Sequence, residues 1–225
     1  MTFAEVEAWV RGELPPPPAR VLEIGAGDGS LARRLAARGY DVTAIDPKSE
    51  SPDVEPVALV DLGEPPQPFD AAVAVVSLHH VEPLEPSLER LARVLAPGAP
   101  LLLDEFDVDA LDQRTAAWWL DRRRERCEQE HETPQELIET MRAKVHTLDR
   151  LAAALEPWFE VGAPLRGTYL YRWKLAESLR PLEERLVEAG ALSRTGARII
   201  ARRRAELPRA EPPRRAPRSR AADRG

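Results

Sequence analysis

One stretch of ten residues constrains the fold of this chain more than any other: VLEIGAGDGS, at residues 21–30. Its first four residues are mostly apolar and include two β-branched side chains, which predicts a short buried strand. Gly25, Gly27 and Gly29 then predict a tight turn, because glycine adopts positive φ angles without steric cost. Residues 31–37 carry apolar side chains at helical spacing. The stretch therefore predicts a strand, a turn and a helix in succession.

The turn is a candidate binding site for a nucleotide-type ligand. The helix opens at Gly29 or Ser30, so its unpaired N–H groups and the positive end of its dipole face whatever lies there. A dinucleotide-binding turn has the pattern G-x-G-x-x-G, but Ser30 stands where the third glycine would be. Glu23 lies two residues before the first glycine, and a carboxylate there favours a cationic ligand over a pyrophosphate.

An acidic residue follows each of the next two predicted strands. Asp46 ends a strand at residues 41–45 and lies 19 residues after Gly27, where a doubly wound sheet places a carboxylate for ribose hydroxyls. The alternative is a solvated aspartate in a turn before Pro47. A third strand is predicted at residues 56–60, with Asp61 at its end.

The second strong signal is the apolar run that begins at residue 69. Its nearly continuous apolar character predicts a central strand buried on both faces, as in a parallel sheet. The polar break Ser77-Leu78-His79-His80 falls at its carboxyl end, where open sheets bind their ligands. A helix at residues 86–96, a turn at residues 97–98 and a further strand at residues 100–106 follow.

These motifs, taken in order, resemble those of the class I S-adenosylmethionine (SAM) dependent methyltransferases, in particular the small-molecule branch. The similarity covers residues 20–106 and rests on three segments: E-x-G-x-G-x-G at 23–29, an aspartate, apolar strand and paired histidine at 70–80, and RVLAPGA at 93–99. It implies an α/β fold with a doubly wound, seven-stranded, mostly parallel sheet, closed by an antiparallel strand at residues 197–201.

The resemblance also implies how SAM is bound and which residues bind it. The three glycines would lie against its methionyl moiety, and Glu23 would orient the turn or the methionyl amine. The remaining assignments are Asp46 at the ribose and Asp61 at the adenine.

Methyl transfer is an in-line displacement, so positioning supplies most of the catalysis. A base is needed only if the acceptor must lose a proton. His79 and His80 are the candidates, and the sequence does not separate them; the alternative is that one of them packs beneath SAM. Of Asp104 and Glu105, one would face the acceptor, or both form a solvated pair at a strand end. The cysteine and histidine spacings do not resemble a metal site, so no metal is expected.

The chain divides into a methyltransferase domain at 1–206, with a SAM-binding core at 20–106 and an acceptor-side half at 107–206, and a Pro/Arg-rich tail at 207–225 that is expected to be disordered. The acceptor-side half is predicted to hold strands at 158–161 and 168–171 and helices at 112–130, 134–144, 147–155 and 175–188. Trp118 and Trp119 face different ways on a helix, so at least one is predicted to be core.

Composition limits the partners and the compartment. The net charge of −6 argues against a nucleic-acid surface, and no apolar run is long enough to span a membrane. With one cysteine, Cys127, and no signal-peptide pattern, the expectation is a soluble cytoplasmic protein with a small-molecule acceptor. The oligomeric state stays open. Two alternatives also stay open: a SAM-binding protein without turnover, and a nicotinamide-dependent oxidoreductase.

Overall fold

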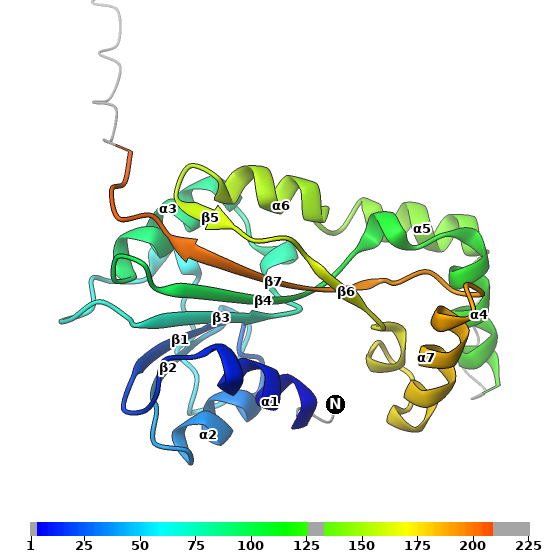
Figure 1. Ribbon diagram of the computed structural model, residues 1–225, viewed down its shortest axis with the longest axis horizontal. Helices are drawn as coiled ribbons and strands as arrows, with labels where there is room; N and C mark the ends of the chain where they lie inside the picture. Colours follow the sequence, from blue (N-terminus) through cyan, green and yellow to red (C-terminus); the bar gives the residue numbers. More distant parts are fainter. Residues whose placement is uncertain (1–3, 126–132, 209–225) are drawn as a thin grey trace, which may run out of the picture.

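A seven-stranded sheet runs through the centre of the computed structural model, which describes residues 4–125 and 133–208 (Figure 1). Four parallel strands lie in the order β2-β1-β3-β4, and β7 pairs antiparallel with β4 and carries both β5 and β6 on its other edge. The strands are β1 (Arg20–Ile24), β2 (Asp41–Ile45), β3 (Ala71–Val75), β4 (Pro100–Phe106), β5 (Phe159–Val161), β6 (Leu165–Gly167) and β7 (Gly196–Arg203). The predicted mostly parallel sheet and its antiparallel closing strand are confirmed.

Helices cover both faces of the sheet (Figure 1). They are α1 (Ala4–Glu13), α2 (Ser30–Ala36), α3 (Leu84–Val94), α4 (Gln113–Arg124), α5 (Pro134–Arg142), α6 (Leu148–Leu155) and α7 (Arg180–Glu188). Alternate residues of β1 point to opposite faces: Val21 packs with α1 and α2, whereas Leu22 packs with α3 and α6. Two apolar layers therefore hold the central strands rigidly between them.

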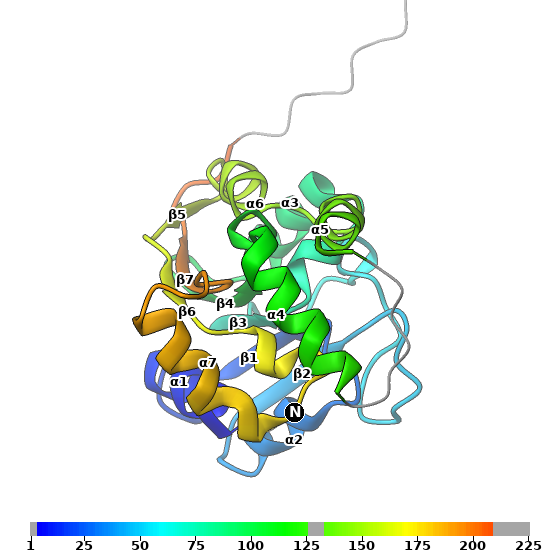
Figure 2. The same cartoon turned by 90° about the vertical axis from the view of Figure 1, so that its right-hand side faces the viewer.

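A third apolar cluster lies beyond the carboxyl ends of β3 and β4, where α4 and α7 cover the end of the sheet (Figure 2). Its aromatic rings are stacked: Trp119 lies 4.1 Å from Trp173, and Phe106 lies 4.9 Å from Tyr169, centroid to centroid. The indole N–H of Trp119 donates to the carbonyl of Trp173 at 2.8 Å. Trp119 is core, as expected of one of the two adjacent tryptophans, and Trp118 is half-buried.

The predicted strand at residues 56–60 does not form. A single bridge joins Ile45 to Glu55, and the chain then turns through a short 3₁₀ helix at Leu59–Asp61. Pro56 has no N–H to donate to a ladder, and the next N–H, of Val57, donates back to the carbonyl of Glu55 at 2.8 Å. Strand β2 is therefore left as an edge of the sheet.

The strand predicted at residues 168–171 is also wrong. The strand β6 ends at Gly167, and residues 170–172 form a 3₁₀ turn. The carboxylate of Glu183, on α7, accepts the N–H groups of Tyr169, Leu170 and Tyr171 at 2.7–3.0 Å. Because these N–H groups already donate to a side chain, they are not available for hydrogen bonds to a neighbouring strand.

The helix predicted over 175–188 begins only at Arg180, with Pro181 in its first turn, and residues 177–179 form a separate 3₁₀ turn. Thr147 caps α6, and its side chain accepts the N–H of Arg150 at 3.1 Å. The helix predicted over 112–130 is described as far as Arg124, and its later residues, including Cys127, lie outside the described residues. So does the tail from residue 209 on. Across residues 4–125 and 133–208, no helix is both long enough and apolar enough to span a bilayer.

Candidate functional site

The glycine turn is held between the ends of two neighbouring strands. The N–H groups of Gly25 and Ala26 donate to the carbonyl of Ile45 at 2.8 and 3.1 Å, and the Ser77 hydroxyl donates to the carbonyl of Ile24 at 2.6 Å. Gly25 has φ of 68°, and a Cβ there would lie 2.3 Å from the Cβ of Ser77. Only glycine therefore fits at position 25 without a shift of the backbone.

A cavity of about 640 Å³ opens at the carboxyl ends of β1, β2 and β3. Gly25, Asp46 and His80 line it together with the loop at residues 57–59. Lys144, just past α5, closes another side. The topology thus brings together residues from three separate sequence motifs at the edge where open α/β sheets bind ligands.

Asp46 presents its carboxylate to this cavity from the end of β2. One oxygen accepts the N–H of Gly27 at 3.0 Å and the other accepts the N–H of Lys48 at 2.8 Å. A carboxylate offers about four acceptor positions, so each oxygen keeps capacity for a further donor such as a hydroxyl. The contact with Lys48 is that of a turn aspartate, as the alternative expected, and the contact with Gly27 joins this turn to the glycine turn.

The two histidines, which the sequence left equivalent, occupy different environments. His80 lines the cavity. Partial burial lowers the pKa of its imidazole, and repulsion from a protonated His79 lowers it further. His79 is 3% exposed, and its Nδ1 is hydrogen-bonded to the buried carboxylate of Glu105. That carboxylate also accepts the N–H of Leu78 at 2.9 Å, which fixes the 3₁₀ turn Leu78–His80. His80 is therefore the histidine that a ligand in the cavity would meet.

Glu23 is buried beneath the turn rather than exposed in the cavity. It lies on the same face of β1 as Val21, and burial raises its pKa to about 8. Its Oε2 atom has no hydrogen-bond partner within the described part of the chain. An unsatisfied buried carboxylate oxygen is costly. Its position beneath the turn is consistent with orienting the turn, the first of the two roles expected of it, whereas a carboxyl with this pKa is protonated at pH 7 and carries no charge for a cationic group.

The remaining cofactor candidates lie outside the cavity lining. Asp61 is exposed at the end of its 3₁₀ turn and does not line the cavity. Of the three glycines only Gly25 lines it, whereas Gly27 is exposed and Gly29 is the N-cap residue that precedes α2, with φ of 75°. The structure therefore gives the adenine assignment of Asp61 no geometric support, and the roles of Gly27 and Gly29 remain those of the turn.

Asp104 and Glu105 point to opposite faces of β4, but neither is solvated. Both are at most 1% exposed, so the interpretation as a solvated pair is wrong. Glu105 bonds His79, and Asp104 is paired with Arg172 at 2.6 Å and with Arg198 at 3.2 Å. These partners lie far along the chain, which is why the pair appeared to be free in the sequence.

Sequence reasoning missed Val76 and Lys144 as lining residues, and it gave Ser77 no separate role. Val76 has φ of 54°, a strained conformation for a β-branched residue, and its N–H donates to the carbonyl of Asp104 at 2.7 Å. Strain of this kind persists only where the surroundings enforce it, and it is common at functional sites. The polar break after the central strand was a signal for Ser77; no pattern pointed to Lys144.

The described residues, 4–125 and 133–208, contain no group of three His, Cys, Asp or Glu side chains placed to hold a metal ion.

The parallel order β2-β1-β3-β4, the antiparallel β7 and a glycine turn against a cavity define the class of Rossmann-like α/β proteins. Residues 4–144 match the family described as "Methyltransferase domain", and the chain belongs to that family. The resemblance to SAM-dependent methyltransferases noted in the sequence is thereby confirmed.

Relatives and solved structures agree with this assignment. An uncharacterized methyltransferase of Mycobacterium tuberculosis is 39% identical over 98 residues, which cover 39% of this chain and 40% of the relative. A ubiquinone biosynthesis O-methyltransferase of Xylella fastidiosa is 32% identical over 114 residues, covering 44% of this chain and 46% of the relative. The matched segments thus span less than half of each of these two relatives.

Among solved structures, a SAM-dependent methyltransferase of Methanosarcina mazei superposes with a TM-score of 0.58 at 21% identity, covering 88% of this chain and 98% of that one. One from Mesorhizobium loti gives the same TM-score at 17% identity, covering 87% of this chain and 96% of that one. At these identities the likeness concerns the fold.

Proposed function

We propose that the protein is an enzyme that transfers the methyl group of SAM to a small-molecule acceptor. The observation that carries the proposal is that Gly25, Asp46 and His80, from three separate motifs, line one cavity. Membership of the methyltransferase family supports it. The net charge of −6 favours a small molecule over a nucleic acid as acceptor.

The residues around the turn fit SAM by their chemistry. The cavity, of about 640 Å³, lies within the range of small-molecule sites. Asp46 offers free acceptor positions for ribose hydroxyls, and nothing lies within 4 Å of a Cβ built on Gly27, so a ligand has open access to the backbone there. When bound, SAM supplies a methyl group on a positively charged sulfur.

The protein's own task is to position the acceptor and, where needed, to remove its proton. Positioning reacting groups in line is worth a large part of the barrier in displacement reactions. The lowered pKa of His80 keeps its imidazole neutral at pH 7, so a ring nitrogen is able to accept the proton of a hydroxyl or a protonated amine. Glu105 holds His79 and the N–H of Leu78, and thereby fixes the turn that carries His80. His79 is a positioning residue in this scheme.

Calorimetric titration with S-adenosylhomocysteine and, separately, with NADH tests the cofactor. We expect micromolar binding of S-adenosylhomocysteine and no binding of NADH. Binding of NADH alone would refute the proposal and favour the oxidoreductase alternative.

Turnover distinguishes an enzyme from a SAM-binding protein. The purified protein is incubated with SAM and a panel of phenols, amines and carboxylic acids, and release of S-adenosylhomocysteine is measured. For a hydroxyl acceptor we expect His80→Ala to lower kcat by about 10²-fold or more while the affinity for S-adenosylhomocysteine changes little. The exposed Asp61→Ala variant is the control and should keep its kcat. An unchanged kcat in His80→Ala would remove His80 as the base.

A further inference from the structure

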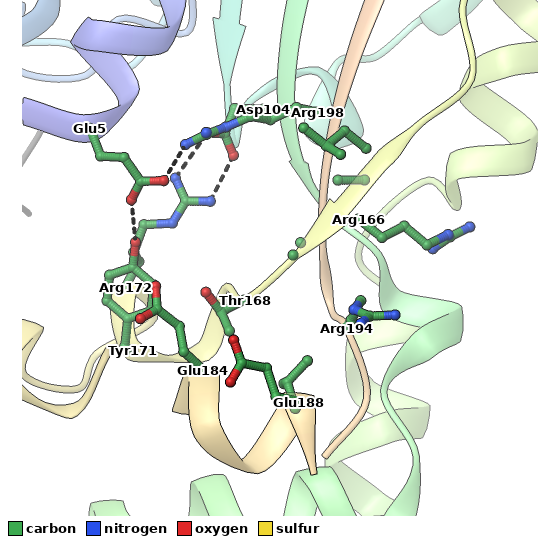
Figure 3. Close-up of a pocket in the computed structure, with 15 residues that line it drawn as sticks. Glu5, Asp104, Arg166, Thr168, Tyr171, Arg172, Glu184, Glu188, Arg194 and Arg198 are labelled. Atoms are coloured by element: carbon green, nitrogen blue, oxygen red, sulfur yellow. Dashed lines mark hydrogen bonds and ion pairs between the residues drawn. The ribbon is translucent and has the colours of Figure 1, made fainter. Parts of the chain in front are cut away.

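A second cavity, of about 360 Å³, lies between α1, α7 and the β6–β7 edge of the sheet (Figure 3). It shares no lining residue with the cavity at the glycine turn. Four arginines and four acidic residues line it. The charges available to a ligand are those that are not already paired with one another.

The inner wall is a closed network of ion pairs. The carboxylate of Asp104 accepts from Arg172 at 2.6 and 3.2 Å and from the Nε of Arg198 at 3.2 Å, and Arg198 in turn reaches Glu5 at 3.1 Å (Figure 3). The Arg172 side chain is 5% exposed, and its Nε has no hydrogen-bond partner within residues 4–125 and 133–208. The charged groups of this wall therefore pair with one another rather than with a ligand.

The outer wall holds one unpaired charge of each sign. Arg166 pairs with Asp107, and Glu184 accepts from Arg180 at 2.8 Å. Arg194 and Glu188 make no ion pair or hydrogen bond within the described part of the chain, and both line the cavity. In Figure 3 they lie on its far side from the Asp104 network.

The mouth of the cavity is also apolar. Leu165 lines it and is 69% exposed, which is unusual for a large hydrophobic residue in the described part of the chain. Val187 of α7 lines the cavity as well. Apolar surface beside a few unpaired polar groups is the usual composition of a small-molecule site.

We propose that this cavity binds a small zwitterion of the amino-acid class, with its carboxylate toward Arg194 and its ammonium toward Glu188. A ligand with only an anionic group would leave Glu188 unpaired beside it, and a ligand with only a cationic group would leave Arg194 unpaired. A zwitterion pairs both, and charge matching of this kind sets specificity. The inference does not rest on methyl transfer, because it uses none of the residues of the cofactor cavity.

Binding is tested on the full chain with each of the common L-amino acids in turn, at concentrations up to about 10 mM, by calorimetry or ligand-observed NMR. The amino acid that binds most tightly is then compared with its N-acetyl derivative and its methyl ester, each of which lacks one charge. We expect at least one amino acid to bind, and both derivatives to bind about tenfold more weakly or worse. Failure of all of them to bind, or equal binding of the derivatives, would overturn the proposal.

Variants locate the binding. Arg194→Gln and Glu188→Gln should each weaken it by about tenfold or more, because each removes one charge-assisted contact. Arg185→Gln is the matched control, since Arg185 is exposed on α7 but does not line the cavity. S-adenosylhomocysteine affinity should be the same in all three variants, which also shows that they fold. Retained amino-acid binding in both cavity variants would place the ligand elsewhere.

Discussion

Replacing Gly25 by alanine should destabilise the protein strongly, through two separate effects. At φ of 68° an alanine is strained by about 1–2 kcal/mol. Its Cβ would also lie 2.3 Å from the Cβ of Ser77, and relieving such a clash in a packed region costs about 1–3 kcal/mol. The free energy of unfolding should therefore fall by about 2–5 kcal/mol.

A double-mutant cycle separates the two effects. Ser77→Gly removes the Cβ that causes the clash but also the 2.6 Å hydrogen bond to the carbonyl of Ile24, so alone it should cost about 1 kcal/mol. In the double variant the steric part disappears, and only the conformational strain and the lost hydrogen bond remain. The loss should therefore be smaller than the sum of the two single losses by about 1–3 kcal/mol.

Urea unfolding followed by far-UV circular dichroism measures all four proteins. The slope of the transition must be unchanged for the comparison to hold. Strictly additive losses, or a Gly25→Ala variant within about 0.5 kcal/mol of the parent, would refute the close approach of Gly25 and Ser77.

Three further predictions follow from the site and the acceptor-side half. Asp46→Ala should weaken S-adenosylhomocysteine binding by about 2–3 kcal/mol in calorimetry, whereas Asp61→Ala should leave it unchanged; equal losses would contradict the placement of the two aspartates. Because the pKa of Glu23 rises to about 8 on folding, its ionisation favours the unfolded state, and the free energy of unfolding should fall by about 1.4 kcal/mol per pH unit between about pH 5 and pH 8. Glu23→Gln should flatten that dependence in urea titrations at several pH values, and an identical slope in the variant would exclude Glu23 as its source. Glu183→Ala leaves the N–H groups of residues 169–171 without their acceptor and should cost about 3 kcal/mol or more in thermal or urea unfolding; a loss below about 1 kcal/mol would show that other groups or water replace the carboxylate.

The sequence was sufficient where structure depends on local patterns. The glycine turn, the buried central strand and the closing strand at residues 197–201 all carry their signal within a few residues, and each formed as predicted. The spacing of Asp46 from the turn likewise placed it in the cavity.

It was insufficient where a residue's surroundings come from distant segments. Asp104 meets Arg172 and Arg198, 68 and 94 residues further along the chain, so its burial has no local signal. The contrast between His79 and His80 depends on Glu105, 26 residues beyond His79. The strand predicted at residues 56–60 does not form because Pro56 has no N–H for a ladder and residues 59–61 form a 3₁₀ turn. The apolar pattern that predicted the strand does not report either effect.

The position of β7 has a consequence for how the protein folds. This last strand pairs with β4, β5 and β6 and supplies Arg198 to the buried Asp104. Until residues 196–203 leave the ribosome, β4 has an unpaired edge and Asp104 lacks one of its partners. Contacts of such long sequence separation slow folding, and an open apolar edge invites association with other chains. A fragment that stops at residue 144, where the family match ends, should therefore aggregate although it contains the whole glycine turn.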